Sequence, residues 1–330
     1  MSATYETAHL MNTILTLYYL EELTQADIAA RLGLSVPKVN RILQDARRQG
    51  LVEITIKTPF QHLFDLEGRL KSIFGLRDVI VIPPLIEGAS SALYPAMFHT
   101  LGQAGASFLL EHLRDGDIIA VGGGMAVNSV VEVIESPRPF DVQVVPVLGA
   151  TQGRVTTDVN YLASRLAERL GGRVYQLHAP AFADTREQRD AIENMGPVKE
   201  ILNIARQATV AVLGVGTVDY ETSRFVQFTA LSPDDMKRIA EDYHGVGEVS
   251  AYVYDVAGRP CAPEYAGRVV GLTLDELMRV PYRIGVAATA AKSLAIYGAL
   301  RGGFLHALIT DEVAARGAIE LFEREFRPQW

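Results

Sequence analysis

The 330-residue sequence contains a single cysteine, Cys261, so it cannot form a disulfide bond within the chain. A reducing, cytoplasmic setting fits this count. It has no unbroken apolar run near the roughly 18 residues that a membrane helix needs, and no N-terminal basic stretch followed by an apolar segment, as in a signal peptide. We therefore expect a cytoplasmic protein with no membrane partner.

The sequence also lacks the usual signatures of cofactor and metal sites. It contains neither a G-x-G-x-x-G fingerprint nor a Walker A motif, which disfavours a nicotinamide or ATP site and hence a dinucleotide-binding redox sensor. Its seven histidines form no metal-spaced pair, and no G-x-S-x-G or cysteine–histidine motif is present. We expect no cofactor, no metal ion and no set of catalytic residues.

The sequence also lacks an excess of positive charge, because acidic residues outnumber basic ones and the formal net charge is -8. A protein that coats nucleic acid over its whole surface would be basic, so any DNA contact must come from a local patch. The apolar fraction of 48% and the charged fraction of 21% are those of an ordinary globular protein. The length favours two domains.

Helical patterns fill most of residues 1–57. Apolar spacing predicts a helix over 10–19. Two further helices are expected on either side of Gly33, which can adopt the left-handed conformation that ends a helix, with Thr24 and Ser35 as their N-caps. The alternating segment 51–57 predicts a strand, as in a winged helix–turn–helix. In the helix after Gly33, the residues expected to face inward are Val36, Val39, Ile42, Leu43 and Ala46.

A helix–turn–helix can place its second helix in the major groove of DNA. That helix carries four basic residues against one acidic residue, whereas the remainder of 1–57 is acidic. A helical hairpin with a solvated basic face is the alternative, but the turn glycine, the caps, the small packing residues and the positive helix coincide. The predicted DNA contacts are Thr24, Gln25, Ser35, Lys38, Asn40, Arg41, Gln44, Arg47 and Arg48, the last two to phosphates.

From residue 58 onward, apolar β-rich runs alternate with helical patterns. Strands are expected at 79–82, 118–121, 142–148, 174–177, 210–215, 249–254, 269–272, 284–287 and 305–309. Helices are expected at 60–74, 96–113, 126–134, 161–170, 198–207, 290–300 and 312–323. This alternation predicts an α/β fold with a mainly parallel sheet and helices on both faces. Ligands of such sheets bind at the carboxyl ends of the strands, near a reversal of strand order.

Two glycine turns follow buried strands, in IIAVGGGMAV and in VAVLGVGT. Backbone N–H groups in such turns can bind an anion, although a tight turn needs glycine with or without a ligand. Lys292 falls in the first turn of an alanine-rich helix, where it opposes the helix dipole unless an anionic ligand binds there. An exposed lysine is the alternative. Asp158 and Asn160 either contact ligand hydroxyls or begin a helix.

In order and spacing, these segments resemble the SorC-type bacterial transcriptional regulators, also called the sugar-binding-domain or deoxyribonucleoside-regulator family. The resemblance covers nearly the whole chain. It rests on YYLEELTQADIAARLGLSVPKVNRILQDARRQGLVEI, LEGRLKSIFGLRDVIVI, VGGGMAV, DVNYLASRLAERLGGRVYQLHAP, VLGVGT, GEVSAYVYDVAGRP and KSLAIYGALRGGFLHALITDEVAA. It implies a winged helix–turn–helix DNA-binding domain over 1–57. Over 58–330 it implies an effector-binding and oligomerisation domain similar to glucosamine-6-phosphate deaminase and ribose-5-phosphate isomerase.

The resemblance further implies operator DNA as a partner, a homo-oligomer (dimer or tetramer), and a sugar, polyol or sugar-phosphate effector. The effector site that it implies comprises Gly122, Gly123, Gly124, Met125, Ala126, Gly149, Ala150, Thr151, Asp158, Asn160, Gly214, Gly216, Thr217, Glu248 and Lys292. The sequence departs from the family pattern at Met125 and Ala126, which lack a hydroxyl, and at Ala287, Ala288 and Ala290, which replace glycines. Both departures remove features that favour phosphate and leave a neutral sugar or polyol open.

We therefore expect a sequence-specific DNA-binding regulator of carbohydrate or polyol catabolism that is not an enzyme. The alternative is a sugar-phosphate isomerase or deaminase fused to a DNA-binding domain. Such an enzyme would need a placed acid–base pair, for example Glu248 or Asp158 with a histidine. The sequence shows no convincing pair of this kind.

Overall fold

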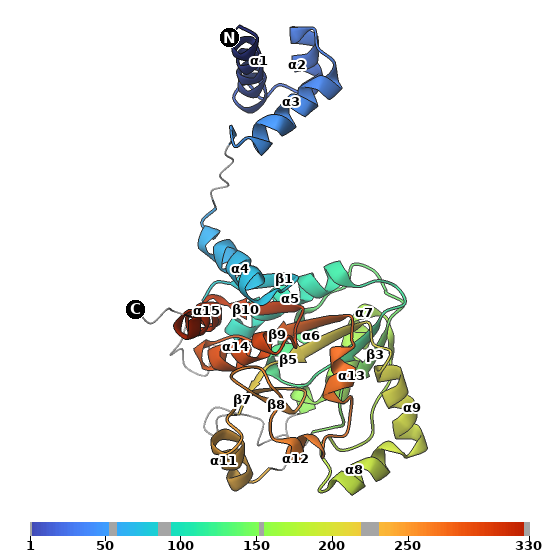
Figure 1. Cartoon of the computed structure of the whole chain (residues 1–330). Coiled ribbons are helices and arrows are strands. Elements are labelled where there is room, and N and C mark those ends of the chain that lie inside the picture. The colour runs from blue at the N-terminus through green and yellow to red at the C-terminus, as the bar shows by residue number, and fades with distance from the viewer. Residues whose placement is uncertain (1, 53–57, 85–93, 152–154, 219–230, 327–330) are drawn as a thin grey trace. The chain divides into compact units, whose positions relative to one another are not determined.

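The computed structural model of the chain (Figure 1) describes every residue except 1, 53–57, 85–93, 152–154, 219–230 and 327–330. The chain divides into two compact units, Met1–Pro59 and Phe60–Trp330. Most of the strand predicted over 51–57, and with it the predicted wing, lies outside the described residues.

In its described residues, the first unit has three helices around a core of its own: α1 (Ser2–Tyr19), α2 (Gln25–Leu32) and α3 (Val36–Arg48). α2 begins after Thr24, whose hydroxyl accepts a hydrogen bond from the Asp27 N–H at 3.2 Å. It ends at Gly33, whose φ of 64° lets its N–H donate to the Ala29 carbonyl. Both predicted ends of α2 are confirmed. The buried core of the first unit comprises Ile14, Leu17, Ile28, Ala29, Val39 and Leu43.

The start of α3 differs from the prediction in two respects. Ser35 has the extended backbone of an N-cap, but its side chain makes no capping hydrogen bond. Val36 is 43% exposed, so its predicted inward position is wrong. The core with α1 and α2 begins at Val39, and the first turn of α3 projects from it.

The second unit is built on a seven-stranded sheet with the order β1-β10-β9-β5-β2-β3-β4, in which all neighbouring strands run parallel. The predicted α/β fold with a mainly parallel sheet is confirmed. The strands are β1 (Asp78–Ile82), β2 (Ile118–Val121), β3 (Gln143–Pro146), β4 (Arg173–Val174), β5 (Val210–Gly214), β9 (Tyr282–Val286) and β10 (Ala307–Asp311).

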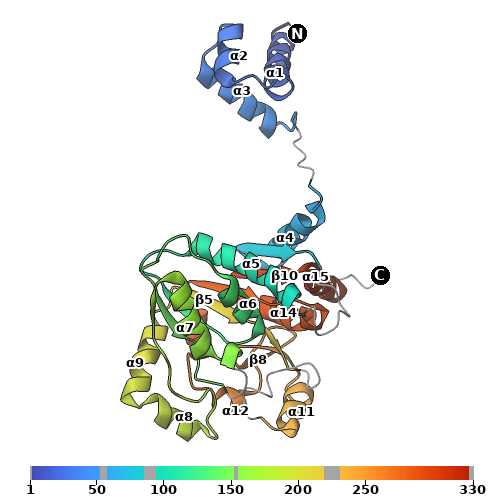
Figure 2. The ribbon, with the colours of Figure 1, turned by 180° about the vertical axis from the view of Figure 1, so that it is seen from behind.

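Helices cover both faces of this sheet because its side chains alternate between two cores. Ala120 and Leu213 face one core, whereas Val121 and Val212 face the other. The first core is covered by α4 (Gln61–Phe74), α9 (Gly196–Ala205), α14 (Ser293–Arg301) and α15 (Glu312–Phe326). The second is covered by α5 (Tyr94–His112), α6 (Met125–Val133) and α7 (Val159–Leu170). Figure 1 shows α14 and α15 in front of the sheet, and Figure 2 shows α5, α6 and α7 in front of it.

A second, antiparallel sheet consists of β6 (Gly216–Thr217), β7 (Gly245–Val249) and β8 (Tyr252–Asp255). It shares a small core with α11 (Pro233–Glu241) and α12 (Pro263–Ala266). The single strand predicted over 249–254 is wrong, because the chain turns at Ser250 and Ala251. The remaining helical elements among the described residues are η1 (Val155–Thr157), α8 (Arg186–Glu193), α13 (Leu274–Met278) and η2 (Ala290–Lys292).

Two other predicted elements have a different form. The apolar run 269–272 is buried but makes only isolated bridges, from Val269 to Phe182 and from Gly271 to Leu148, so it is not a strand. The helix predicted over 290–300 begins as the 3₁₀ turn η2 before α14. In 269–272 the apolar pattern reflects burial, which several backbone conformations can provide.

The order of strands reverses between β2 and β5. β3 and β4 continue from β2 toward one edge, whereas β9 and β10 continue from β5 toward the other. At such a reversal the connections leave opposite faces of the sheet and a crevice opens beyond the strand ends. The first predicted glycine turn follows β2 at Gly122, whereas the second lies between the end of β5 at Gly214 and the start of β6 at Gly216.

Candidate functional site

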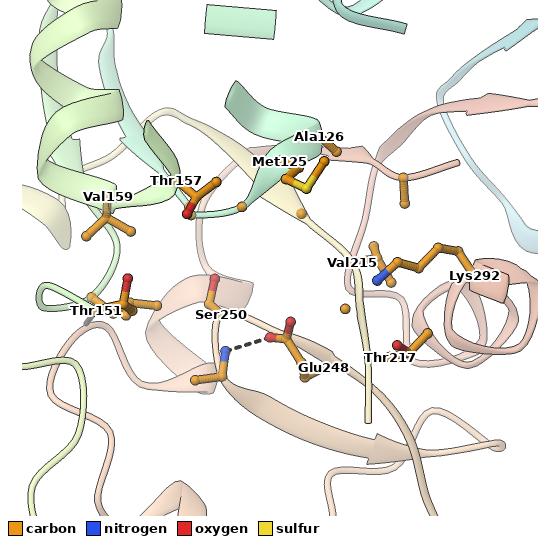
Figure 3. Close-up of a pocket in the computed structure, with 18 of the residues that line it drawn as sticks. Met125, Ala126, Thr151, Thr157, Val159, Val215, Thr217, Glu248, Ser250 and Lys292 are labelled. Atoms are coloured by element: carbon orange, nitrogen blue, oxygen red, sulfur yellow. Dashed lines mark hydrogen bonds between the residues drawn. The ribbon is translucent and has the colours of Figure 1, made fainter. Parts of the chain in front are cut away.

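A cavity of about 390 Å³ lies beyond the carboxyl ends of β2 and β5 (Figure 3). One wall comes from the glycine turns and the residues after β9, and another comes from the antiparallel sheet. Eleven of the fifteen predicted effector residues line it: Gly122, Gly123, Gly124, Met125, Ala126, Thr151, Gly214, Gly216, Thr217, Glu248 and Lys292.

The other four predicted residues, Gly149, Ala150, Asp158 and Asn160, are not among the residues that line the cavity. Gly149 lies against the next segment of backbone, because a Cβ atom there would stand 2.3 Å from the Pro180 carbonyl oxygen. Ala150 forms a parallel bridge to Pro180. The close approach of two backbones explains the glycine without a ligand.

Asp158 and Asn160 make structural contacts at the start of α7. Asp158 is its N-cap, with one carboxylate oxygen accepting from the Asn160 N–H at 2.9 Å and the other from the Thr151 N–H at 3.0 Å. The Asn160 side chain accepts from the Leu177 N–H at 2.8 Å and donates to the Leu177 carbonyl at 3.1 Å. Asp158 thereby holds Thr151, which does line the cavity, in place.

Glu248 supplies the carboxyl group of the cavity. Its side chain packs on Gly216, where a Cβ atom would stand 1.8 Å from Oε1, so a side chain at this position would displace the carboxyl group. Oε2 accepts a hydrogen bond from the Ala251 N–H at 2.9 Å. Burial raises the pKa of Glu248, while the Ala251 N–H and the charge of Lys292 oppose that rise.

Lys292 supplies the ammonium group. It is the last residue of η2, immediately before α14, and Figure 3 shows its side chain extending into the cavity toward Val215. A cation at the start of a helix is disfavoured by the helix dipole. The carboxyl group of Glu248 or an anionic ligand would stabilise the positive charge of Lys292 there. The cavity thus combines one acidic and one basic group, a set that can bind an uncharged polar ligand or a monoanion.

Hydroxyl groups and apolar surfaces that the sequence reasoning missed complete the lining. The hydroxyl residues are Thr157, Ser250 and Thr289, and the larger apolar residues include Phe98, Leu148 and Phe182. Ser250, Ala251 and Thr289 have φ values of 50°, 69° and 91°, in the left-handed region that residues other than glycine rarely adopt. Such strain concentrates at functional sites, but no local sequence pattern announces it.

Two negative findings apply to the part of the chain that the structure describes. No group of three or more histidine, cysteine, aspartate or glutamate side chains there is arranged to hold a metal ion. Likewise, none of the helices in these ranges is both long enough and apolar enough to cross a bilayer.

The predicted DNA-contacting residues lie on α3 and at the start of α2. All are exposed except Gln25, which is half-buried. Arg47 donates from Nε to the Tyr19 hydroxyl at 2.8 Å, and Arg48 forms an ion pair with Asp45. Lys38 and Arg41 therefore stand out as the exposed cations on the earlier turns of α3, where a helix in the major groove reaches base edges.

Comparison with known proteins agrees with this two-part arrangement. Residues 58–320 match the sugar-binding domain family Sugar-bind, and residues 12–49 match region 4 of sigma-70. The erythritol catabolism regulatory protein EryD of Brucella abortus is 28% identical over 307 residues, 92% of this chain and 94% of that protein. The deoxyribonucleoside regulator of Bacillus subtilis is 28% identical over 305 residues, 92% and 95% of the two chains.

Among solved structures, the full-length sorbitol operon regulator SorC of Klebsiella pneumoniae superposes with a TM-score of 0.71 at 28% identity. The match covers 93% of this chain and 97% of that one, so it includes both units. A cavity at the strand reversal, an exposed basic helix of a helix–turn–helix, and a sugar-binding family match over most of the length thus agree. The chain belongs to the SorC-type family of transcriptional regulators, with a Sugar-bind domain over 58–320.

Proposed function

We propose that this chain binds operator DNA through α3 and that a small polyhydroxylated effector in the cavity sets its affinity for that DNA. The genes under its control serve carbohydrate or polyol catabolism, and the protein acts in the cytoplasm, where those genes are. The observation that carries the proposal is the cavity of about 390 Å³ at the ends of β2 and β5, lined by hydroxyl groups, Glu248 and Lys292.

The lining favours a sugar, a polyol or a sugar phosphate as the effector. Threonine and serine hydroxyls, with a carboxyl and an ammonium group, can pair with several ligand hydroxyls. Apolar side chains such as Phe98 and Phe182 can cover the C–H faces of the same ligand. Relatives named for erythritol, for sorbitol and for deoxyribonucleosides support this class of effector.

Specific DNA binding favours more than one copy of the chain. A single 13-residue helix with a few cations makes too few phosphate contacts for tight binding at cellular salt. Two or four linked helices multiply the affinity without any new contact. We therefore propose a homo-oligomer, either a dimer or a tetramer, whose subunit arrangement responds to the effector.

In this proposal the cavity binds the effector but does not catalyse a reaction on it. Among its described lining residues, Glu248 and Lys292 are the ionisable side chains, and no histidine accompanies them as the expected acid–base partner. Incubation with a panel of sugar phosphates tests this point. We expect recovery of the starting compounds, and steady formation of an isomerised or deaminated product would favour the enzyme alternative.

A thermal-shift screen followed by DNA binding tests the main proposal. The screen would contain four- to six-carbon sugars and polyols and their monophosphates. We expect at least one of them to raise the Tm, because a ligand at 100 times its Kd stabilises the folded state by about 2.7 kcal/mol. The same compound should change the affinity for a DNA fragment from upstream of the chain's own gene. A compound that binds but leaves that affinity unchanged would contradict effector control.

A further inference from the structure

The turn between β7 and β8 carries strain at the edge of the cavity. Val249 pairs with Tyr252, so Ser250 and Ala251 form a two-residue hairpin loop. Both have positive φ, 50° and 69°, which such a turn requires and which asparagine and glycine provide at least cost. Serine and alanine therefore stand where the backbone alone would favour other residues.

Ser250 also holds a hydroxyl group without a partner. It lines the cavity, and its Oγ is buried with no hydrogen-bond partner among the described residues. A buried polar atom left unpaired is costly and calls for a specific explanation. Figure 3 shows Ser250 on the same wall as Glu248, with Lys292 extending from the opposite side.

The hairpin by itself does not account for a serine. The turn is already closed by the bond from the Ala251 N–H to Glu248, and the Ser250 hydroxyl adds no bond to it within the described structure. Rotation about χ1, the one torsion that moves Oγ, can turn the hydroxyl toward the cavity without breaking such a bond. A ligand hydroxyl at this wall would satisfy it.

We propose that Ser250 determines effector specificity by forming a hydrogen bond to one hydroxyl group of the bound sugar or polyol. This inference rests on the proposed function and adds a residue that selects among effectors. A site built to pair with a ligand hydroxyl rejects the analogue that lacks it, because the buried group is then left unpaired. The effector therefore carries a hydroxyl at the position that meets Ser250, and the corresponding deoxy compound binds less tightly.

Calorimetric titration of wild type and Ser250→Ala with erythritol, sorbitol, other four- to six-carbon sugars and polyols, and their monophosphates tests the proposal. Thr310→Val is the matched control. The Thr310 hydroxyl is likewise buried without a partner among the described residues, but it lies in β10 and does not line the cavity. Neither substitution removes a hydrogen bond of the described structure, so we expect both variants to remain folded, with Tm values at or above that of wild type.

We expect Ser250→Ala to weaken binding of the best probe about tenfold and Thr310→Val to leave it unchanged. One deoxy derivative of that probe should bind wild type about tenfold less tightly, yet bind Ser250→Ala as well as the parent compound does. Equal affinity of wild type and Ser250→Ala for every probe would overturn the role of Ser250 alone. Failure of wild type to bind any probe would instead overturn the proposed function.

Discussion

At the residue scale, the chemistry of the cavity depends on Glu248 and Lys292. Burial raises the pKa of Glu248, and the charge of Lys292 opposes that rise. An uncharged ligand needs only their hydrogen bonds, whereas a phosphorylated ligand also needs the positive charge of Lys292. Substitution of Lys292 therefore separates the two kinds of effector.

We expect Lys292→Ala to weaken binding of a phosphorylated effector at least tenfold and binding of its unphosphorylated parent much less. The physical reason is that a phosphate loses an ion pair with the ammonium group, whereas a polyol loses only a hydrogen bond from the ammonium group to an uncharged hydroxyl. Calorimetric titration of both compounds measures the difference. Unchanged affinity for a phosphorylated effector would show that Lys292 does not bind the phosphate.

A second residue-scale effect lies at the opposite, amino-terminal end of the strands. His306 stacks on Tyr282 with ring centroids 6.1 Å apart, and its Nδ1 accepts a hydrogen bond from the Arg283 N–H at 3.2 Å. Burial, followed by the charges of Arg283 and Arg77, lowers the pKa of His306 to about 4. The folded state therefore holds this imidazole neutral at pH values where the unfolded chain protonates it.

This shift predicts a loss of stability on acidification. The contribution of His306 is fully present above its unfolded pKa of about 6.5 and is lost as the pH falls toward 4. In His306→Asn the amide oxygen can still accept a hydrogen bond from the Arg283 N–H, but the side chain no longer titrates. We therefore expect this variant to lose less unfolding free energy than wild type between pH 7 and pH 5. Urea unfolding at the two pH values measures it. His244→Asn, at an exposed position with φ of 52° that asparagine tolerates, should behave as wild type.

At the scale of elements, local chemistry explains most helix ends and many strands. The Thr24 cap, the Gly33 turn and strand β2 are where the sequence predicts them. The β7–β8 hairpin is missed because its turn contains neither glycine nor asparagine. The run 269–272 is mistaken for a strand because its apolar residues are buried by tertiary packing without a ladder of hydrogen bonds.

The Gly33 turn allows a test at this scale. A Cβ atom at Gly33 would meet nothing within 4 Å, so only the backbone conformation, with φ of +64°, opposes a side chain. We expect Gly33→Ala to lower the unfolding free energy of the first unit by about 1–2 kcal/mol. Differential scanning calorimetry measures the change.

The control for that substitution is Gly68→Ala. Gly68 lies inside α4, also with open space around its missing Cβ, and has no positive φ. Alanine there should stabilise the second unit by roughly 0.5–1 kcal/mol. A Gly33→Ala variant as stable as wild type would contradict a strained turn between α2 and α3.

At the scale of the whole molecule, we propose that the two compact units divide DNA binding and effector binding between them. Residues 1–59 hold the exposed basic helix and residues 60–330 hold the cavity. Each unit has its own buried core. A substitution on the surface of one unit should therefore leave the binding properties of the other intact.

We expect Arg41→Ala to lower operator affinity about tenfold or more while the Kd of the effector stays unchanged, because Arg41 is exposed on α3 and lies outside the second unit. Arg31→Ala is the control, since Arg31 is an exposed cation on α2 that pairs with Glu21 at 3.2 Å. Fluorescence anisotropy with labelled DNA, at fixed salt, compares the variants. Normal operator binding by a folded Arg41→Ala variant would refute the proposed docking.

The sequence by itself determined the helix–turn–helix, the parallel α/β sheet and the glycine turns beside the cavity, because caps, turns and apolar periodicity act between residues close together in the chain. Only the tertiary structure decided which further side chains complete the lining of the cavity. It brings Phe98, Thr157, Ser250 and Thr289 together from four separate segments. In the tertiary structure the Asn160 side chain forms hydrogen bonds with the backbone of Leu177 and does not line the cavity. Contacts between distant segments depend on how the elements pack, and packing leaves no pattern in any one stretch of sequence.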